Sequence, residues 1–95
     1  LDNFAILKVG DSRNPFAMPN VKIYTTPFCV FCKMTKDFFA ANEVAYEEFN
    51  VAADAKAREE MISKSGQFGV PVTDIGGQLV IGFDRARLSE LLGLK

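Results

Sequence analysis

Apolar and polar residues follow one another along this chain in segments whose periods predict four short strands. Residues 21–25 are β-branched and aromatic, which is typical of a strand. Residues 44–49 alternate between apolar and polar positions and predict a second strand. Two further strands, 70–75 and 78–81, are expected on either side of Gly76-Gly77, because paired glycines favour a tight hairpin turn.

Three other segments have the character of helices. The apolar residues of 29–42 recur at helical spacing and are expected to form the buried face of a helix: Phe31, Met34, Phe38 and Ala41. An alanine-rich helix is expected over 52–65, closed by Gly66, with Lys64 on an ordinary solvated face. Asp84 is a favourable N-cap for a last helix with its leucines on one side.

The order of these elements, β-α-β-α-β-β-α, predicts an α/β fold with a mixed four-stranded sheet flanked by three helices. A helix joins the first two strands, which are therefore expected to be parallel, whereas the last two form an antiparallel hairpin. Loop-forming residues precede the first strand, so residues 1–19 are expected to be an N-terminal leader or extension outside the core. Residues 20–95 form the one predicted domain.

The composition of the 95 residues excludes several classes of function. A formal net charge of −1 provides no basic surface for a nucleic acid. The longest apolar stretches are far too short to span a bilayer, and residues 1–17 lack the apolar region of a signal peptide. The chain is therefore expected to be a cytoplasmic monomer with neither a membrane nor a nucleic-acid partner.

The only two cysteines form the motif Cys29-Val30-Phe31-Cys32, between a predicted strand and a predicted helix. Unpaired backbone N–H groups at a helix start favour the thiolate of the first cysteine, and Lys33 and Lys36 are expected to add positive potential. Cys32 lies one turn inside the helix, so it is expected to be buried and harder to ionise. These differences predict a redox site in which Cys29 attacks a disulfide and Cys32 resolves the mixed disulfide.

Two alternatives remain open for this pair. Tetrahedral metal sites need four ligands, and the chain has no histidine and no third cysteine. A metal or iron–sulfur site would therefore require a dimer that pools Cys29 and Cys32 from two chains. The cysteines could also be inert core residues, although their position after a strand and Pro27 favours the redox interpretation.

A second candidate element is Pro71, which follows Val70 where a strand is expected to begin. The simple interpretation is a proline at a strand entry, which needs no backbone N–H there. The alternative is a cis bond that faces the dithiol and leaves the backbone of Val70 free to pair with an extended substrate. Near the sulfur, Phe28 and Val30 are expected to be exposed as a docking surface, and Phe31 to lie in the core.

Taken together, residues 20–94 resemble a glutaredoxin. Three segments carry the resemblance alongside the cysteine motif and its preceding Tyr24-Thr25-Thr26-Pro27-Phe28. Residues 58–66 are similar to the second helix of bacterial glutaredoxins, Gly69-Val70-Pro71 occupies the family's Thr-Val-Pro position, and Gly82-Phe83-Asp84 occupies its Gly-Cys-Asp or Gly-Ser-Asp position. The resemblance implies a thioredoxin fold and a cis Pro71.

The resemblance also implies an activity and a ligand. It implies an enzyme that reduces protein disulfides or glutathione mixed disulfides, with no tightly bound cofactor and with glutathione as a possible co-substrate. In the family, glutathione pairs with the backbone of the residue before the cis proline, here Val70. Its γ-glutamyl end lies at the start of the last helix, here Phe83 and Asp84.

Several positions depart from the usual glutathione-binding pattern. Val30-Phe31 stands in place of Pro-Tyr, and Thr26 and Gln67 stand where basic residues are common. Phe83 after a glycine is instead similar to the NrdH-type redoxins, which thioredoxin reductase reduces and which can donate electrons to ribonucleotide reductase. The reductant is therefore either glutathione or thioredoxin reductase.

Overall fold

The computed structural model describes residues 20–94, and the expected leader or extension lies outside this part of the chain. The order of the elements is β-α-β-α-β-β-α, as predicted. The elements are β1 (Val21–Thr25), α1 (Val30–Ala41), β2 (Glu47–Asn50), α2 (Ala55–Ser65), β3 (Val72–Ile75), β4 (Gln78–Ile81) and α3 (Arg85–Leu92).

The four strands form one mixed sheet in the order β2-β1-β3-β4. β1 pairs with β2 in parallel and with β3 in antiparallel, and β3 pairs with β4 in antiparallel. Both predictions of strand direction are therefore confirmed. Since β1 is central, its C-terminal end delivers the chain into α1 beside the beginning of β3, where Tyr24 is paired with Val72.

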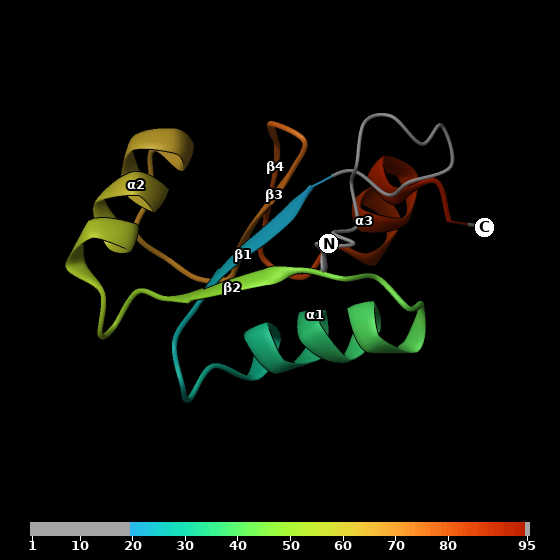
Figure 1. The fold of residues 1–95 in the computed structure, drawn as a ribbon, viewed down its shortest axis with the longest axis horizontal. Helices are drawn as coiled ribbons and strands as arrows, with labels where there is room; N and C mark the ends of the chain where they lie inside the picture. The colour runs from blue at the N-terminus through green and yellow to red at the C-terminus, as the bar shows by residue number, and fades with distance from the viewer. Residues whose placement is uncertain (1–19, 95) are drawn as a thin grey trace, which may run out of the picture.

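The helices cover both faces of the sheet. Ile23 of β1 packs in one core cluster with residues of α1 and α3, such as Phe39 and Leu88. Tyr24, whose side chain points to the opposite face, packs in a second cluster with Met61 of α2. In Figure 1, α1 runs below β1 and β2, α2 lies at the left and α3 at the right. This arrangement is the predicted thioredoxin fold.

Three elements begin clearly later than predicted, while the other boundaries lie close to the prediction. β2 begins at Glu47, and α2 begins at Ala55 because the Asp54 side chain caps its first turn. β3 begins at Val72, which follows a proline that has no N–H to donate to a ladder. The predicted end of α2 is confirmed, since Gly66 adopts the left-handed conformation with φ of 73°.

The predicted buried face of α1 was wrong. The helix is rotated about its own axis relative to the prediction, so that a different set of side chains faces the sheet. Phe31, Met34 and Ala41 are exposed, whereas Phe38 is buried as expected. The residues that face the sheet are Cys32, Thr35, Phe38 and Phe39. Burial of Cys32 requires this rotation, because residues three and seven positions further along a helix share its face.

Lys64 is exposed, as expected, but its ammonium also contacts the sheet. Its Nζ lies 2.7 Å from a carboxylate oxygen of Asp74 and 3.0 Å from the hydroxyl oxygen of Tyr24. Burial opposes the charge of Lys64, but these two hydrogen bonds outweigh it and raise its pKa. Lys64 therefore joins α2 to β3 and β1.

Candidate active site

Cys29 is the N-cap of α1, directly after the turn that follows β1. Its Sγ accepts a hydrogen bond from the backbone N–H of Cys32 at 3.1 Å. The side chain is partly exposed. A sulfur in this position receives one of the backbone donors that a helix start leaves unpaired.

Cys32 has a very different environment, with only 1% of its surface exposed. Burial raises the pKa of Cys32 to about 12, and its hydrogen bond with Cys29 adds to this shift. The backbone of Thr26 and the charge of Lys36 act in the opposite direction. The two thiols are therefore chemically unequal: one is accessible, and the other is buried and protonated at neutral pH.

The cis peptide bond implied by the resemblance is present between Val70 and Pro71. The thiol of Cys29 points at the carbonyl oxygen of Val70, with a distance of 3.8 Å between sulfur and oxygen. These residues are 41 positions apart in the sequence and come together through the β1–β3 pairing. The structure thus places the dithiol and the cis-proline segment side by side.

The start of α3 is linked to the same segment. The backbone N–H of Gly82 donates to the carbonyl oxygen of Pro71 at 2.8 Å, so the next two residues lie beside the cis-proline strand. Asp84 is the N-cap of α3, as predicted, and accepts from the N–H of Arg87 at 3.1 Å. The ring of Phe83 packs edge-on against Phe38, with 6.1 Å between their centroids.

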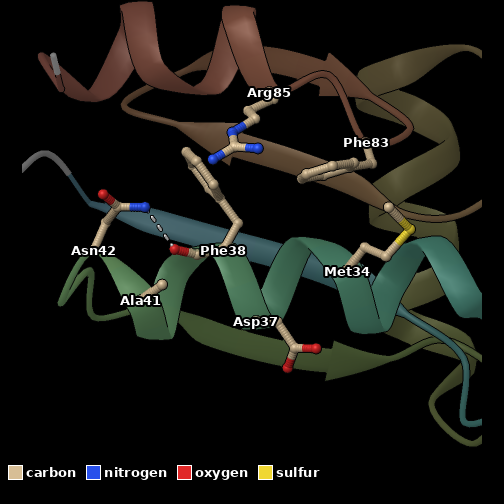
Figure 2. A pocket seen from close by; sticks show the side chains of 7 residues that line it. All are labelled: Met34, Asp37, Phe38, Ala41, Asn42, Phe83 and Arg85. Atoms are coloured by element: carbon tan, nitrogen blue, oxygen red, sulfur yellow. Dashed lines mark hydrogen bonds between the residues drawn. The ribbon is translucent and has the colours of Figure 1, made fainter.

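A groove of about 310 Å³ lies between α1 and the start of α3. Figure 2 shows Met34 and Phe38 pointing from α1 towards Phe83 and Arg85. The guanidinium of Arg85 lies 5.8 Å from the centre of the Phe38 ring. The side chain of Phe83 therefore faces α1 and this groove, while its backbone continues the segment beside Pro71.

Exposed apolar side chains surround Cys29. Phe28 and Val30 are 96% and 70% exposed, as expected, but Phe31 is 58% exposed and not a core residue. We refer to these three residues as the apolar rim. A further exposed ring, not predicted from the sequence, is Phe68, which is 71% exposed and lies two residues before Val70. Its neighbours Gly66 and Gly69 were the available signal, because a phenylalanine in a glycine-bounded loop has little core to enter.

The two lysines that follow the cysteines have different partners. Lys33 pairs with Asp37 on the exposed side of α1 at 2.8 Å. Lys36 pairs with Glu48 of β2 at 2.9 Å, and the same carboxylate oxygen accepts from the hydroxyl of Thr25 at 2.6 Å. Glu48 and Thr25 were not predicted as partners of this lysine network, because their contacts depend on strand register.

Two further observations concern the part of the chain that the structure describes. Within residues 20–94, no three histidine, cysteine, aspartate or glutamate side chains are grouped to hold a metal ion. None of the helices in this range is long and apolar enough to cross a membrane.

Comparison with known proteins identifies the family of this chain. The sequence model of the glutaredoxin family matches residues 21–80. The chain belongs to the glutaredoxin family. It is 44% identical over 72 residues to a glutaredoxin-like 8.6 kDa protein of the rubredoxin operon of Clostridium pasteurianum. That match covers 76% of this chain and 96% of the relative. A glutaredoxin-family chain with a Cys-x-x-Cys pair is a thiol–disulfide oxidoreductase.

Solved structures agree with this family and fold. The thioredoxin-like protein BC3987 superimposes with a TM-score of 0.73 and 38% identity, over 77% of this chain and 100% of that one. The glutaredoxin-like protein NrdH-redoxin from Escherichia coli superimposes with a TM-score of 0.69 and 26% identity. The latter match covers 76% of this chain and 93% of the redoxin, whose activity profile is described as thioredoxin-like.

Proposed function

We propose that this protein reduces disulfides of protein substrates or glutathione mixed disulfides, with Cys29 as the nucleophile and Cys32 as the resolving thiol. The observation that carries the proposal is the inequality of the two sulfurs. Cys29 is accessible at a helix start, whereas Cys32 is 1% exposed and its pKa is raised to about 12 by burial. A nucleophile must meet its substrate, and a resolving thiol must stay protonated until it is needed.

The reaction has two steps. The thiolate of Cys29 attacks one sulfur of the substrate disulfide, which forms a mixed disulfide and releases the other substrate sulfur as a thiolate. Cys32 then loses its proton and attacks the sulfur of Cys29, which releases the second substrate sulfur. The substrate has gained two electrons, and the protein is left with a Cys29–Cys32 disulfide that a reductant must open.

We further propose that the cis-proline segment and the apolar rim position the substrate. The 3.8 Å contact between Cys29 and Val70 places backbone groups beside the sulfur, where an extended peptide or glutathione can pair with them. Phe28 and Val30 then contact apolar groups that flank the substrate sulfur. For glutathione, Phe83 and Asp84 would receive the γ-glutamyl end. No tightly bound cofactor enters this scheme.

A second candidate is a redoxin that thioredoxin reductase reduces and that donates electrons to ribonucleotide reductase. The apolar rim supports it, because an exposed hydrophobic surface suits a protein partner better than a small anionic peptide. The similarity to NrdH-redoxin also supports it. At Gln67, the side-chain amide donates to the carbonyl of Gly69 at 2.9 Å, which provides no cation for a carboxylate of glutathione.

Paired reductase assays distinguish these candidates and test the two cysteines. Reduction of the protein by glutathione with glutathione reductase is compared with reduction by thioredoxin reductase, each followed by NADPH consumption. We expect Cys29→Ser to abolish all activity, and Cys32→Ser to retain activity only on glutathione mixed disulfides. Full disulfide reductase activity in Cys29→Ser would disprove the proposed mechanism.

We also propose that the protein acts as a monomer in the cytoplasm. The alternative of a metal or iron–sulfur dimer predicts colour or stoichiometric metal in protein purified without oxygen. Its mass in solution, measured on the same sample, then reports whether two chains associate. A colourless, metal-free and active monomer removes that alternative.

A further inference from the structure

Cys32 must lose its proton to resolve the mixed disulfide, although its sulfur is buried. An ion that lies close to a buried thiol changes how easily the thiolate forms. Burial raises the pKa of Cys32 most and Cys29 adds to this, while the positive charge of Lys36 lowers it. Cys29 is consumed in the mixed disulfide at this stage, whereas the ammonium of Lys36 stays in place beside its counter-ion Glu48.

Lys36 is placed and held for this role by the fold. It follows Cys32 by four residues on α1, so the two side chains lie on neighbouring positions of one helix face. Its Nζ lies 2.9 Å from Glu48, whose carboxylate also accepts from the hydroxyl of the buried Thr25 at 2.6 Å. This anchorage ties the lysine to β2 and to the end of β1, with its side chain only 31% exposed.

Lys33 provides the contrast. It is adjacent to Cys32 in the sequence, but its side chain is 75% exposed and its partner Asp37 is 64% exposed. Its ion pair stays on the outer side of α1, whereas the ion pair of Lys36 reaches β2. Besides Cys32 and Glu48, the titratable group that acts on Lys36 is Tyr46.

We infer that Lys36, held by the Glu48 carboxylate, is a positioning residue that stabilises the thiolate of Cys32 during the resolving step. This inference rests on the proposed function of the dithiol. In the step, the proton of Cys32 is released to the solvent, and the thiolate forms a bond to the sulfur of Cys29. The bond between Cys29 and the substrate sulfur breaks, and its electron pair leaves with the substrate as a thiolate.

Stopped-flow mixing of the reduced protein with dithiobis(nitrobenzoate) measures both steps in one trace. Attack by Cys29 releases a first equivalent of yellow thiolate, and resolution by Cys32 releases a second. We expect Lys36→Met to slow the second phase about three- to tenfold at neutral pH and to move its pH profile upwards, with the first phase unchanged relative to Lys33→Met. Lys36→Arg, which keeps the charge, is expected to retain most of the second-phase rate.

Two results would overturn the inference. One is a normal second phase in Lys36→Met. The other is equal slowing of both phases in Lys36→Met and Lys33→Met, which would reflect the general attraction of an anionic probe to any nearby cation. Failure of the proposed function gives a separate signature, because the first phase would then persist in Cys29→Ser.

Discussion

At the scale of single residues, the sulfur atoms of Cys29 and Cys32 are separated by one helical turn but differ in exposure and in their hydrogen bonds. Cys29 accepts a hydrogen bond from a backbone N–H and faces the carbonyl of Val70, whereas the side chain of Cys32 is buried on the inner face of α1. The N-cap position of one residue and the inward face of the other cause the difference. In the proposed mechanism, this local asymmetry allows two identical side chains to perform successive steps.

The exposed ring of Phe28 leads to a prediction about substrate choice. Phe28→Ser is expected to lower kcat/KM for a protein disulfide about tenfold, equivalent to roughly 1.4 kcal/mol, because the ring would bury apolar area against a protein partner. Reduction of a small aromatic disulfide should be unchanged. Steady-state kinetics on both substrates measure the difference.

Phe28→Leu serves as the matched control, since it keeps an apolar side chain at the rim. The ring is 96% exposed, so neither substitution should change the free energy of unfolding. Equal losses on the protein and the small substrate would contradict a docking role and indicate instead a change at Cys29.

At the scale of elements, each helix begins at a residue whose side chain accepts from the first turn. The caps are Cys29 for α1, Asp54 for α2 and Asp84 for α3. Aspartates are ordinary caps, while a cysteine in this position combines the end of a helix with the reactive sulfur. The N-cap position thus has a structural role in two helices and, in the proposed mechanism, also a chemical role in the third.

The cap of α2 can be tested through stability. Asp54 accepts from the N–H groups of Lys56 and Ala57, both at 3.1 Å. Asp54→Ala is expected to lower the free energy of unfolding by about 1 kcal/mol, whereas Asp54→Ser should retain most of it. Urea denaturation measures both. Glu59→Ala, at an exposed position of the same helix, is the control, and a loss as large as that of Asp54→Ala would contradict the role of the cap.

Helix α1 shows how far periodicity alone predicts an element. The prediction placed its ends correctly, because Pro27 and Asn42 are local signals. It chose the wrong face, because apolar residues occur on more than half of the helix circumference. Phe31 is exposed and Phe39 is buried, although both are phenylalanines. Only packing against the sheet distinguishes them.

At the scale of the whole molecule, the ion pair between Lys64 and Asp74 links α2 to the middle of the sheet. Burial opposes the charge on Asp74, but hydrogen bonds from Lys64 and from the N–H of Gly77 prevail and lower its pKa. Because the pKa is lower in the folded state, protonation favours unfolding. The stabilising contribution is therefore present above the ordinary pKa of 3.8 and is lost as the pH falls through the lowered value.

Asp74→Asn tests this contribution. We expect it to lower the free energy of unfolding by about 2 kcal/mol at neutral pH, since the side chains are 28% and 13% exposed and the variant leaves Lys64 without its counter-charge. The difference from the unchanged protein should shrink in acid, below pH 3.8. Urea denaturation across this pH range measures it.

Asp37→Asn provides the control for that measurement. It removes an aspartate of the same charge from the exposed pair with Lys33, so its effect should be close to zero. A pH-independent loss in Asp74→Asn, or an equally large loss in Asp37→Asn, would show that the charge of Asp74 is not the cause.

Local sequence patterns were sufficient to predict the order of elements, the strand directions, the hairpin at Gly76-Gly77, the cap at Asp84 and the position of the dithiol. These features depend on residues that are close together in the chain, and their chemistry is readable from neighbours. Packing between distant elements establishes which face of α1 is buried and which carboxylates pair with Lys64 and Lys36. It also brings the carbonyl oxygen of Val70 to 3.8 Å from the sulfur of Cys29. Those contacts join distant elements, so they depend on strand register and helix rotation, which local patterns do not specify.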